Sequence, residues 1–263
     1  MKKFLPPLFL AVAFFVFDPA NLFAQNSDAV AENQSAKNTA LIPESRGPGW
    51  EKRHDAFLAD AKTNKIDLLF LGDSITDFWR NRGSNVWNHY YAPLHAANFG
   101  ISGDRTQHVL WRMDHGELDG IHPKVVVLMI GTNNTGKERD GKTIRNTVPQ
   151  TIEGVQAVVS EIRKKLPDSK ILLLGIFPRG ATIDDPQRAQ VALVNTVIAK
   201  LNDEKAIQYL DIGSCFLDDK GNLPSSIMPD HLHPNEHGYQ IWADAMNPTL
   251  FKMMGKKKFL GIF

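Results

Sequence analysis

The chain has 263 residues, of which 43% are hydrophobic and 22% are charged, which excludes a wholly disordered chain and a multi-span membrane protein. Its 30 lysines and arginines nearly balance its 29 aspartates and glutamates, so no strong field favours nucleic acid as a partner. The single cysteine, Cys215, excludes an intramolecular disulfide and a cysteine-cluster metal site. Stability must therefore come from a conventional buried core.

The N-terminal segment has the pattern of a secretory signal. Two lysines precede an apolar run over residues 4–17, and this run is shorter than the about 20 residues that a membrane-spanning helix needs. Ala24 places a small residue at the expected cleavage point. We therefore expect residues 1–24 to be a signal peptide, with an uncleaved anchor as the alternative. The mature protein would have no integral membrane span and would be periplasmic or extracellular.

The segments on either side of the predicted domain lack the apolar pattern of a folded core. Residues 25–49 are polar, contain no aromatic side chain and end in proline and glycine, which is typical of a flexible linker. Residues 255–263 carry three lysines, and we expect a frayed tail there rather than a membrane contact. The predicted folded domain is residues 50–254.

Within this domain, helical periodicity alternates with short apolar runs that are typical of strands buried on both faces. The expected helices cover residues 50–63, 86–94, 105–115, 142–166, 187–203 and 236–253. The expected strands cover residues 66–71, 95–99, 125–130, 170–176 and 207–211. Strands separated by crossover helices indicate an α/β protein with three layers, α/β/α, around a five-stranded parallel sheet. In such sheets ligands bind at the carboxyl ends of the strands.

The first predicted strand is followed by a serine that could act as a nucleophile. It ends in the sequence GDSIT (72–76), which places Ser74 at an exposed turn between a strand and a helix. Free backbone N–H groups at the start of a helix stabilise developing negative charge. The same residues are also an ordinary helix N-cap sequence, so this motif alone leaves both interpretations open.

The next two strand ends supply candidate donors for an oxyanion. Gly103 follows the second strand, and glycine lets a substrate approach the backbone N–H closely, although a flexible turn with Asp104 as a helix cap is the alternative. Asn133 follows the third strand, and its side-chain amide can donate, although asparagine is also common in turns. Gly100-x-Ser102 is not a nucleophile elbow, because Asp104 stands where that motif needs glycine.

The last loop contains the sequence DHLHP (230–234). A carboxylate at Asp230 can hold Nδ1 of His233 and leave Nε2 facing a nucleophile. A metal site is one alternative, with the ligands Asp230, His231, His233 and His237, and a plain polar loop is another. The order of serine, glycine, asparagine and Asp-x-x-His at successive strand ends favours serine catalysis without a metal.

Longer segments then resemble a known family. The sequences NFGISGDRTQHVLWRMDHGEL (98–118), VVVLMIGTNN (125–134) and FPRG (177–180) are similar to the SGNH (GDSL-type) hydrolase superfamily, most closely to the catalytic-subunit family of platelet-activating-factor acetylhydrolase. The resemblance implies a flavodoxin-like sheet and no cofactor. It implies a nucleophile at Ser74 and a triad completed by Asp230 and His233. It also implies an oxyanion hole formed by Ser74, Gly103 and Asn133.

Together these patterns and the resemblance predict an exported serine hydrolase. It would remove acetyl or other short acyl groups from an O-acetylated carbohydrate or a platelet-activating-factor-like lipid. Short acyl groups are expected because the loops after Gly72 and Gly103 are short and carry no apolar lid. Asp73 is not expected to be the triad acid. Three further residues are pocket candidates for which a packing or surface role is equally open: Trp79, Arg105 and His231. A noncatalytic carbohydrate- or lipid-binding module is the alternative function, and a homodimer is compatible with the sequence.

Overall fold

The computed structural model describes residues 37–256; the predicted signal peptide, the first part of the predicted linker and most of the tail lie outside these residues. Its sheet consists of β1 (Leu68–Gly72), β2 (Ala96–Gly100), β3 (Val125–Met129), β4 (Lys170–Leu174) and β5 (Ile207–Leu210). All neighbours pair in parallel, in the order β2-β1-β3-β4-β5. This is the flavodoxin-like order, so the predicted fold class is confirmed.

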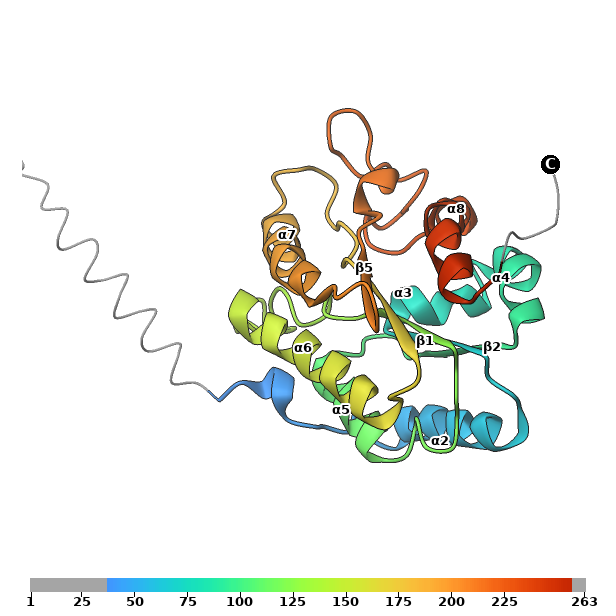
Figure 1. The fold of residues 1–263 in the computed structure, drawn as a ribbon. Coiled ribbons are helices and arrows are strands. Elements are labelled where there is room, and N and C mark those ends of the chain that lie inside the picture. The colour runs from blue at the N-terminus through green and yellow to red at the C-terminus, as the bar shows by residue number, and fades with distance from the viewer. Residues whose placement is uncertain (1–36, 257–263) are drawn as a thin grey trace, which may run out of the picture. The chain divides into compact units, whose positions relative to one another are not determined.

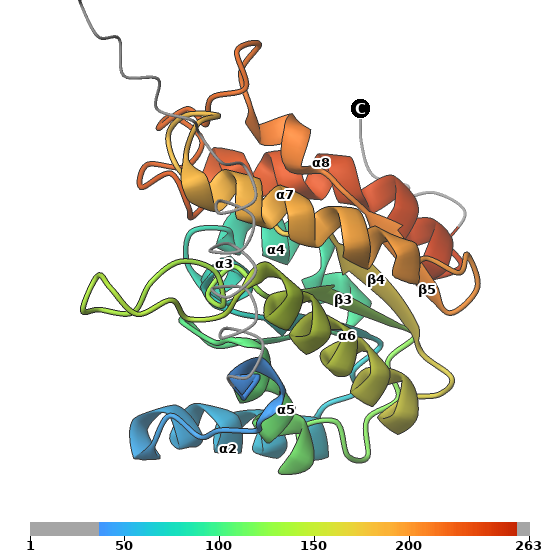
Figure 2. The ribbon, with the colours of Figure 1, turned by 90° about the vertical axis from the view of Figure 1, so that its left-hand side faces the viewer.

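Helices cover both faces of the sheet (Figures 1 and 2). One face packs against α2 (Pro48–Thr63), α5 (Thr106–Asp114), α6 (Val148–Lys165) and α7 (Pro186–Ile198). The other packs against α3 (Ser74–Asp77), α4 (Ser84–Tyr90) and α8 (Glu236–Met253). The 3-10 turns are η1 (Thr39–Leu41), η2 (Phe78–Arg80), η3 (Ala92–Leu94), η4 (Ala199–Leu201) and η5 (Gly213–Phe216). Within residues 37–256, none of the helices is both apolar and long enough to cross a membrane.

The strand residues explain this three-layer arrangement. Every residue of β1 and β3 is buried, because successive side chains point to opposite faces and both faces carry helices. In β3, Val126 and Leu128 pack towards α5 and α6, whereas Val125 and Val127 pack towards α8. The unbroken apolar runs in the sequence therefore reflect burial on both sides.

One predicted helix begins later than expected. The sequence predicts a helix from residue 142, but α6 begins at Val148, where Thr147 and Gln150 form a reciprocal capping box. The Thr147 hydroxyl accepts from the Gln150 N–H at 3.3 Å, and the Gln150 side chain accepts from the Thr147 N–H at 3.0 Å. Residues 130–147 therefore form a long loop after β3, with one isolated antiparallel bridge between Lys137 and Ile144.

The expectation of a flexible linker does not hold for residues 38–49. Ala40 is fully buried, and its carbonyl accepts a hydrogen bond from the Thr106 hydroxyl at 2.9 Å. Arg46 donates to the Ser102 carbonyl at 2.7 Å and to the Asp104 carboxylate at 3.0 Å. These polar groups find partners on the folded domain, which a polar composition alone does not indicate. The start of the folded unit is therefore upstream of Trp50.

A buried arginine joins the ends of β1 and β2. Arg112 has no exposed surface, and its guanidinium forms ion pairs with Asp104, at 3.0 Å, and with Glu117. It also donates to the Phe99 carbonyl at 3.0 Å and contacts the Gly72 carbonyl at 3.5 Å. Since Phe99 and Gly72 lie at the carboxyl ends of the two strands, this side chain fixes the edge of the sheet where the candidate site lies.

We expect Arg112→Met to lower the free energy of unfolding by about 3–5 kcal/mol, because it leaves the buried carboxylate of Glu117 without its cation and removes one of the two arginines that pair with Asp104. Urea denaturation followed by circular dichroism measures this change. The matched control is Lys200→Met, which removes an exposed cation and should alter stability by at most about 0.5 kcal/mol. Equal stability of the Arg112 variant and the wild type would contradict the role given to this network.

Candidate active site

The predicted nucleophile lies just after the carboxyl end of β1, between β2 and the central strand β3. Ser74 is the first residue of α3, which begins almost directly after β1. Gly72 permits this tight turn, because a Cβ at that position would clash with the Thr76 side chain and with the Met129 carbonyl of β3. The sequence predicts an exposed serine, but only 6% of Ser74 is exposed, since the loop that carries His233 covers it.

Ser74, His233 and Asp230 form a continuous hydrogen-bonded relay. The Ser74 Oγ lies 2.8 Å from Nε2 of His233, and Nδ1 of His233 lies 2.7 Å from Oδ2 of Asp230. The other carboxylate oxygen of Asp230 accepts from the His233 backbone N–H at 2.7 Å. The Phe78 ring packs beside the imidazole, with 5.1 Å between ring centroids. The carboxylate therefore binds both the ring and the backbone N–H of His233, with Nε2 oriented towards the serine.

The charge state of Asp230 suits this arrangement. Partial burial raises the pKa of its carboxyl, but hydrogen bonds from the backbone and ring N–H groups of His233 and from the Leu232 N–H outweigh burial and leave the pKa below its ordinary value. An ionised carboxylate accepts from Nδ1–H and leaves Nε2 unprotonated in the neutral imidazole. This tautomer can take a proton from the serine.

The two predicted oxyanion donors lie on loops that contact each other. Gly103 has a φ of +83°, in the left-handed region that favours glycine. Asn133 donates one amide N–H to the carbonyl of the neighbouring Asp104 at 3.0 Å, which leaves the second N–H for another acceptor. Within residues 37–256, the backbone N–H groups of Ser74 and Gly103 have no hydrogen-bond acceptor. The structure thus brings these two loops together. In the described part of the chain, the backbone N–H groups of Ser74 and Gly103 and one amide N–H of Asn133 remain available to a ligand.

Asp77 ties the loop that carries Gly103 to the helix that carries Ser74. Its Oδ2 accepts from the Ser102 hydroxyl at 2.7 Å and from the Ser102 N–H at 3.2 Å. Its Oδ1 accepts from Arg53 at 2.8 Å and from Arg80 at 2.7 Å. Burial raises the pKa of this carboxyl, but the Ser102 and arginine contacts outweigh burial and lower it overall. Asp77 was not predicted, because no local motif links it to residue 102.

Two arginines that the sequence did not single out as site residues bind the loop that carries Asn133. Arg179 donates to the Thr132 carbonyl at 3.0 Å and to the Thr132 hydroxyl at 3.3 Å. Arg145 donates to the Asn133 carbonyl at 3.1 Å. Arg179 belongs to the FPRG segment that contributed to the family resemblance, which was the only signal for it in the sequence.

The three pocket candidates have other contacts. Trp79 is fully buried and packs against Tyr239 with 4.4 Å between ring centroids, so it is a core residue. Arg105 pairs with Glu138 at 2.7 Å. The Nδ1–H of His231 donates to the Leu223 carbonyl at 2.9 Å. Sequence reasoning could not choose between packing and substrate contact for these residues.

The residues of the alternative metal site do not converge. In the part of the chain that the structure describes, no group of three or more histidine, cysteine, aspartate and glutamate side chains could hold a metal ion. Both ring nitrogens of His233 already have protein partners, and the backbone of His231 adopts a φ of +52° that accompanies its contact with Leu223.

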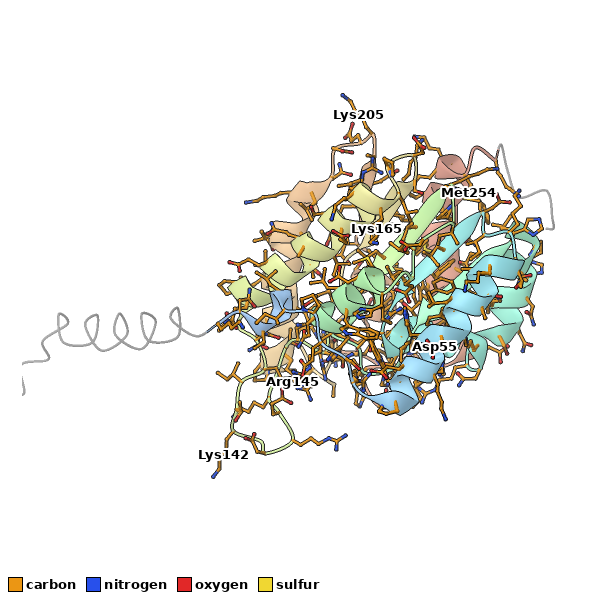
Figure 3. All side chains as sticks on the ribbon, turned by 90° about the horizontal axis from the view of Figure 1, so that it is seen from below. Asp55, Lys142, Arg145, Lys165, Lys205 and Met254 are labelled. Atoms are coloured by element: carbon orange, nitrogen blue, oxygen red, sulfur yellow. The ribbon has the colours of Figure 1, made fainter. Side chains whose placement is uncertain are left out.

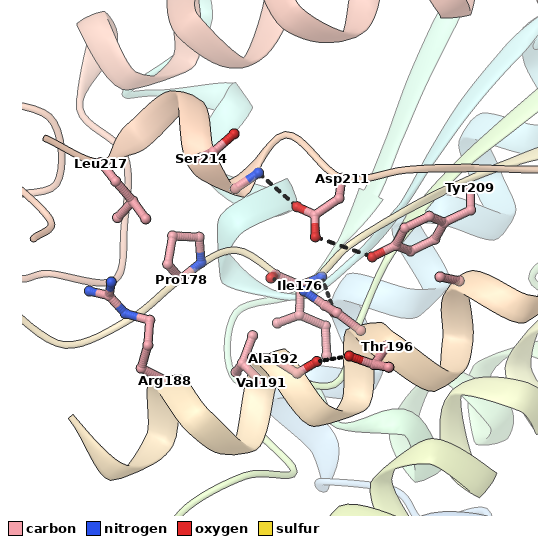
Figure 4. Close-up of a pocket in the computed structure, with 13 residues that line it drawn as sticks. Ile176, Pro178, Arg188, Val191, Ala192, Thr196, Tyr209, Asp211, Ser214 and Leu217 are labelled. Atoms are coloured by element: carbon pink, nitrogen blue, oxygen red, sulfur yellow. Dashed lines mark hydrogen bonds between the residues drawn. The ribbon is translucent and has the colours of Figure 1, made fainter. Parts of the chain in front are cut away.

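A separate cavity of about 420 Å³ lies between α7 and the end of β5 and contains none of the predicted site residues (Figure 4). Asp211 accepts there from the Tyr209 hydroxyl at 3.3 Å and from the Gly213 N–H at 2.8 Å. Arg188 lines the cavity, but its guanidinium donates to three loop carbonyls, those of Arg179, Gly180 and Gly221. Arg188 therefore stabilises the FPRG segment through the carbonyls of Arg179 and Gly180.

Asp73, next to Ser74, is a buried carboxyl with an unusual environment. Its Oδ1 accepts from the Ile75 N–H at 3.0 Å, whereas the buried Oδ2 has no hydrogen-bond partner in the described part of the chain. Burial raises the pKa of Asp73 to about 7, despite the Ile75 contact, and the Asp104 carboxylate contributes in the same direction. Since Asp73 does not contact His233, it is not the acid of the relay, as the sequence predicts.

Comparison with known proteins identifies the family and the fold. A family model described as "GDSL-like Lipase/Acylhydrolase family" matches residues 70–241. Platelet-activating factor acetylhydrolase IB subunit alpha1 of Homo sapiens is 34% identical over 227 residues, covering 86% of this chain and 93% of the relative. Platelet-activating factor acetylhydrolase IB subunit alpha2 of Rattus norvegicus is 36% identical over 228 residues, covering 84% of this chain and 94% of the relative.

Solved structures show the same architecture. An acetylxylan esterase from Geobacillus stearothermophilus matches with a TM-score of 0.56 and 23% identity, covering 74% of this chain and 95% of that chain. At this level of identity the similarity concerns the fold, and function has to be argued from the site.

We expect the stability of the wild type to fall relative to that of Asp73→Asn as the pH rises from about 4 to about 7. In this window the folded state keeps a proton on Asp73, whose pKa is raised from 3.8 to about 7, while the unfolded chain releases it. Stability therefore declines until the folded carboxyl ionises, and asparagine cannot titrate. Urea denaturation of both proteins across this range measures the difference.

The exposed Asp219→Asn is the matched control, since it makes the same chemical change at the surface. A stability difference between Asp73→Asn and the wild type that stays constant with pH would count against a raised pKa at Asp73.

Proposed function

The chain belongs to the GDSL-like lipase/acylhydrolase family and is an ester hydrolase, and we propose that it removes acetyl or other short acyl groups through a serine acyl-enzyme. The observation that carries this proposal is the relay from Ser74 through His233 to Asp230, with distances of 2.8 and 2.7 Å. Such a relay is the arrangement that activates a serine hydroxyl as a nucleophile.

In the proposed acylation step, Nε2 of His233 takes the proton of Ser74 while Oγ attacks the ester carbonyl carbon. The resulting oxyanion would be stabilised by the N–H groups of Ser74 and Gly103 and by the remaining amide N–H of Asn133. The imidazolium, stabilised by Asp230, then gives its proton to the leaving alcohol as the ester C–O bond breaks. The products of this step are the free alcohol and an acyl ester on Ser74.

Deacylation reverses the same proton route. His233 takes a proton from a water molecule that attacks the acyl carbon, and then returns a proton to the Ser74 Oγ as the acid leaves. Every proton transfer in both steps uses Nε2 of His233. The fixed orientation of the imidazole by Asp230 therefore serves both halves of the reaction.

The loops around the relay support a preference for short acyl groups. Few residues separate Gly103 from the start of α5, and α3 begins at Ser74 itself. The long loop over residues 130–147 is mainly polar, and its exposed large apolar side chain is Ile144, at 55% exposure. Each methylene that finds no apolar wall forgoes about 0.8 kcal/mol of burial. A fatty acyl chain would therefore gain little here.

The alcohol portion of the substrate is proposed to be an O-acetylated carbohydrate or a platelet-activating-factor-like lipid. The relatives named platelet-activating factor acetylhydrolase IB support the lipid, at 34% and 36% identity. The acetylxylan esterase supports the carbohydrate only as an analogy at the level of the fold. Both alternatives are acetyl esters, so the acyl side is common to them.

We also propose that the protein is exported to the periplasm or the extracellular space. Support comes from the sequence of residues 1–24, where two lysines precede an apolar run and Ala24 follows at a suitable distance. These residues lie outside the part of the chain that the structure describes.

Ser74→Ala should lower kcat for 4-nitrophenyl acetate by at least about 10⁴-fold while leaving the fold intact, since it removes one hydroxyl and its bond to His233. His233→Ala should cause a similar loss, because the residues of a triad act as a unit. Turnover and circular dichroism are measured on the same samples. Ser214→Ala, at an exposed serine on η5, is the matched control and should keep wild-type turnover. Wild-type turnover by a folded Ser74→Ala protein would overturn the proposal.

Among 4-nitrophenyl esters, the acetate should have a higher kcat/KM than the octanoate, because the polar loops offer no apolar wall to a longer chain. A series from two to twelve carbons, kept below the concentration at which the substrates aggregate, provides the measurement. An optimum at about eight carbons or more would indicate a lipase-like acyl site instead.

If the export proposal is right, expression in a Gram-negative host should yield a mature protein that begins at Gln25 in the periplasm or medium. N-terminal sequencing of each cell fraction identifies the start. Recovery only from the cytoplasm, with Met1 as the first residue, would contradict export.

A further inference from the structure

The loop that carries Asn133 is bordered by arginines with few acidic partners. Arg179 and Arg145 bind the carbonyls of Thr132 and Asn133, each through its Nη1 atom. Within residues 37–256, the Nη2 atom of each of these guanidiniums has no hydrogen-bond acceptor. Each arginine is thus anchored by one nitrogen beside the predicted oxyanion donor, with a second nitrogen left to donate.

The nearest acid is already engaged by another arginine. Glu138 pairs through Oε1 with Nη1 of Arg105 at 2.7 Å and accepts at Oε2 from Nη2 of Arg105 at 2.8 Å. Arg145 reaches the same carboxylate only through Nε, at 3.6 Å, and this Nε is buried without a hydrogen-bond acceptor. One carboxylate therefore faces two arginines, and its short contacts all go to Arg105.

Among residues 37–256, no aspartate or glutamate forms an ion pair with Arg179. The carboxylates that act on it from a distance are Asp185 and Asp73. Asp185 accepts from the Gln187 N–H at 2.9 Å as the cap of α7, and Asp73 is the buried carboxyl described above. Burial lowers the pKa of Arg179, and the charge of Arg145 lowers it further. Burial also lowers the pKa of Arg145, followed by the charge of Arg105. The two guanidiniums thus share a region that is short of negative charge.

This region remains open to a ligand. The Arg145 side chain is 24% exposed, and Figure 3 shows it at the base of a loop whose tip, at Lys142, projects away from the helices. Arg179 is half-buried. Desolvated guanidiniums bind carboxylate or phosphate oxygens more strongly than exposed ones, because less water has to be displaced from them.

We propose that Arg145 and Arg179 form a subsite for an anionic group on the alcohol portion of the substrate, an inference that rests on the proposed esterase function. An acetyl group carries no charge, so the anion must belong to the alcohol. The shared chemistry is a carboxylate or phosphate oxygen close to the acetyl ester. A uronic acid would supply the carboxylate, and a glycerol phosphate or phospholipid headgroup would supply the phosphate.

Two matched pairs of substrates test this subsite. The first pair is O-acetylated methyl glucuronide and O-acetylated methyl glucoside, and the second is acetylated glycerol phosphate and acetylated glycerol. In each pair the anionic group is the main difference. We expect the wild type to prefer the anionic member of at least one pair by about tenfold in kcat/KM. The pair that shows the preference identifies the source of the anion.

Arg145→Gln and Arg179→Gln should each reduce this ratio towards one. Arg139→Gln is the matched control, because it removes an exposed arginine from the same loop without touching Thr132 or Asn133, and it should keep the wild-type ratio. Ratios near one for both pairs in the wild type would overturn the subsite. An equal loss on both members of a pair in the arginine variants, with the ratio kept, would show that these arginines act only by positioning Asn133.

A second readout does not require turnover. Methyl glucuronide or glycerol phosphate should raise the Tm of Ser74→Ala protein more than methyl glucoside or glycerol does, and the arginine substitutions should abolish the difference. Turnover of the neutral esters without any anion effect would sink the subsite but leave the esterase function standing. An anion-dependent Tm shift without turnover of any ester by the wild type would do the reverse.

Discussion

The Arg112 guanidinium, enclosed beneath the ends of β1 and β2, is the interaction on which the site most depends. It reaches the carbonyls of Phe99 and Gly72, and it pairs with Asp104, whose own carbonyl accepts from Asn133. Arg112 thus contacts the end of β1, just before Ser74, and Asp104 in the loop that carries Gly103. Through Asp104 it is also linked to Asn133 in the loop after β3. Burying this charge is costly, and the two carboxylates beside it offset that cost only in this geometry.

Around this anchor, each loop is held by a different charged side chain. Asp77 accepts from the N–H and the hydroxyl of Ser102, and Arg179 and Arg145 donate to the carbonyls of Thr132 and Asn133. Arg188 donates to the carbonyls of Arg179 and Gly180 in the FPRG segment. Loops without regular hydrogen bonding are otherwise the most mobile parts of a fold. The side-chain contacts give them the fixed geometry that preorganised catalysis needs.

The distribution of charge differs on the two sides of the site. Below the loop of Gly103, Asp104 and Glu117 face Arg112 and Arg46, so the buried charges are matched. On the side of the loop over residues 130–147, Glu138 makes its short contacts with Arg105, and Arg145 lies 3.6 Å from the same carboxylate. The matched side supports the fold, whereas Arg145 and Arg179 on the other side are the residues of the proposed anion subsite.

The sequence by itself determined the features that depend on local pattern. Five apolar runs specified a parallel sheet because strands buried on both faces have no polar side, and the spacing of Asp230 and His233 was enough to predict their contact. The start of α6 was predicted too early because the apolar periodicity extends to residues before the capping box at Thr147. The polar composition of residues 38–49 did not reveal that they pack on the domain, because polar groups can hydrogen-bond to other parts of the protein instead of to water.

Only the tertiary structure decided which distant side chains meet. Ser74 and His233 are far apart in the chain, and their 2.8 Å contact requires the last loop to fold over the end of β1. Asp77 pairs with Ser102, and Arg179 with Thr132, but no local spacing pattern in the sequence predicts either contact. Contacts between loops depend on where the sheet places each strand end, and this placement is a property of the whole fold rather than of any segment.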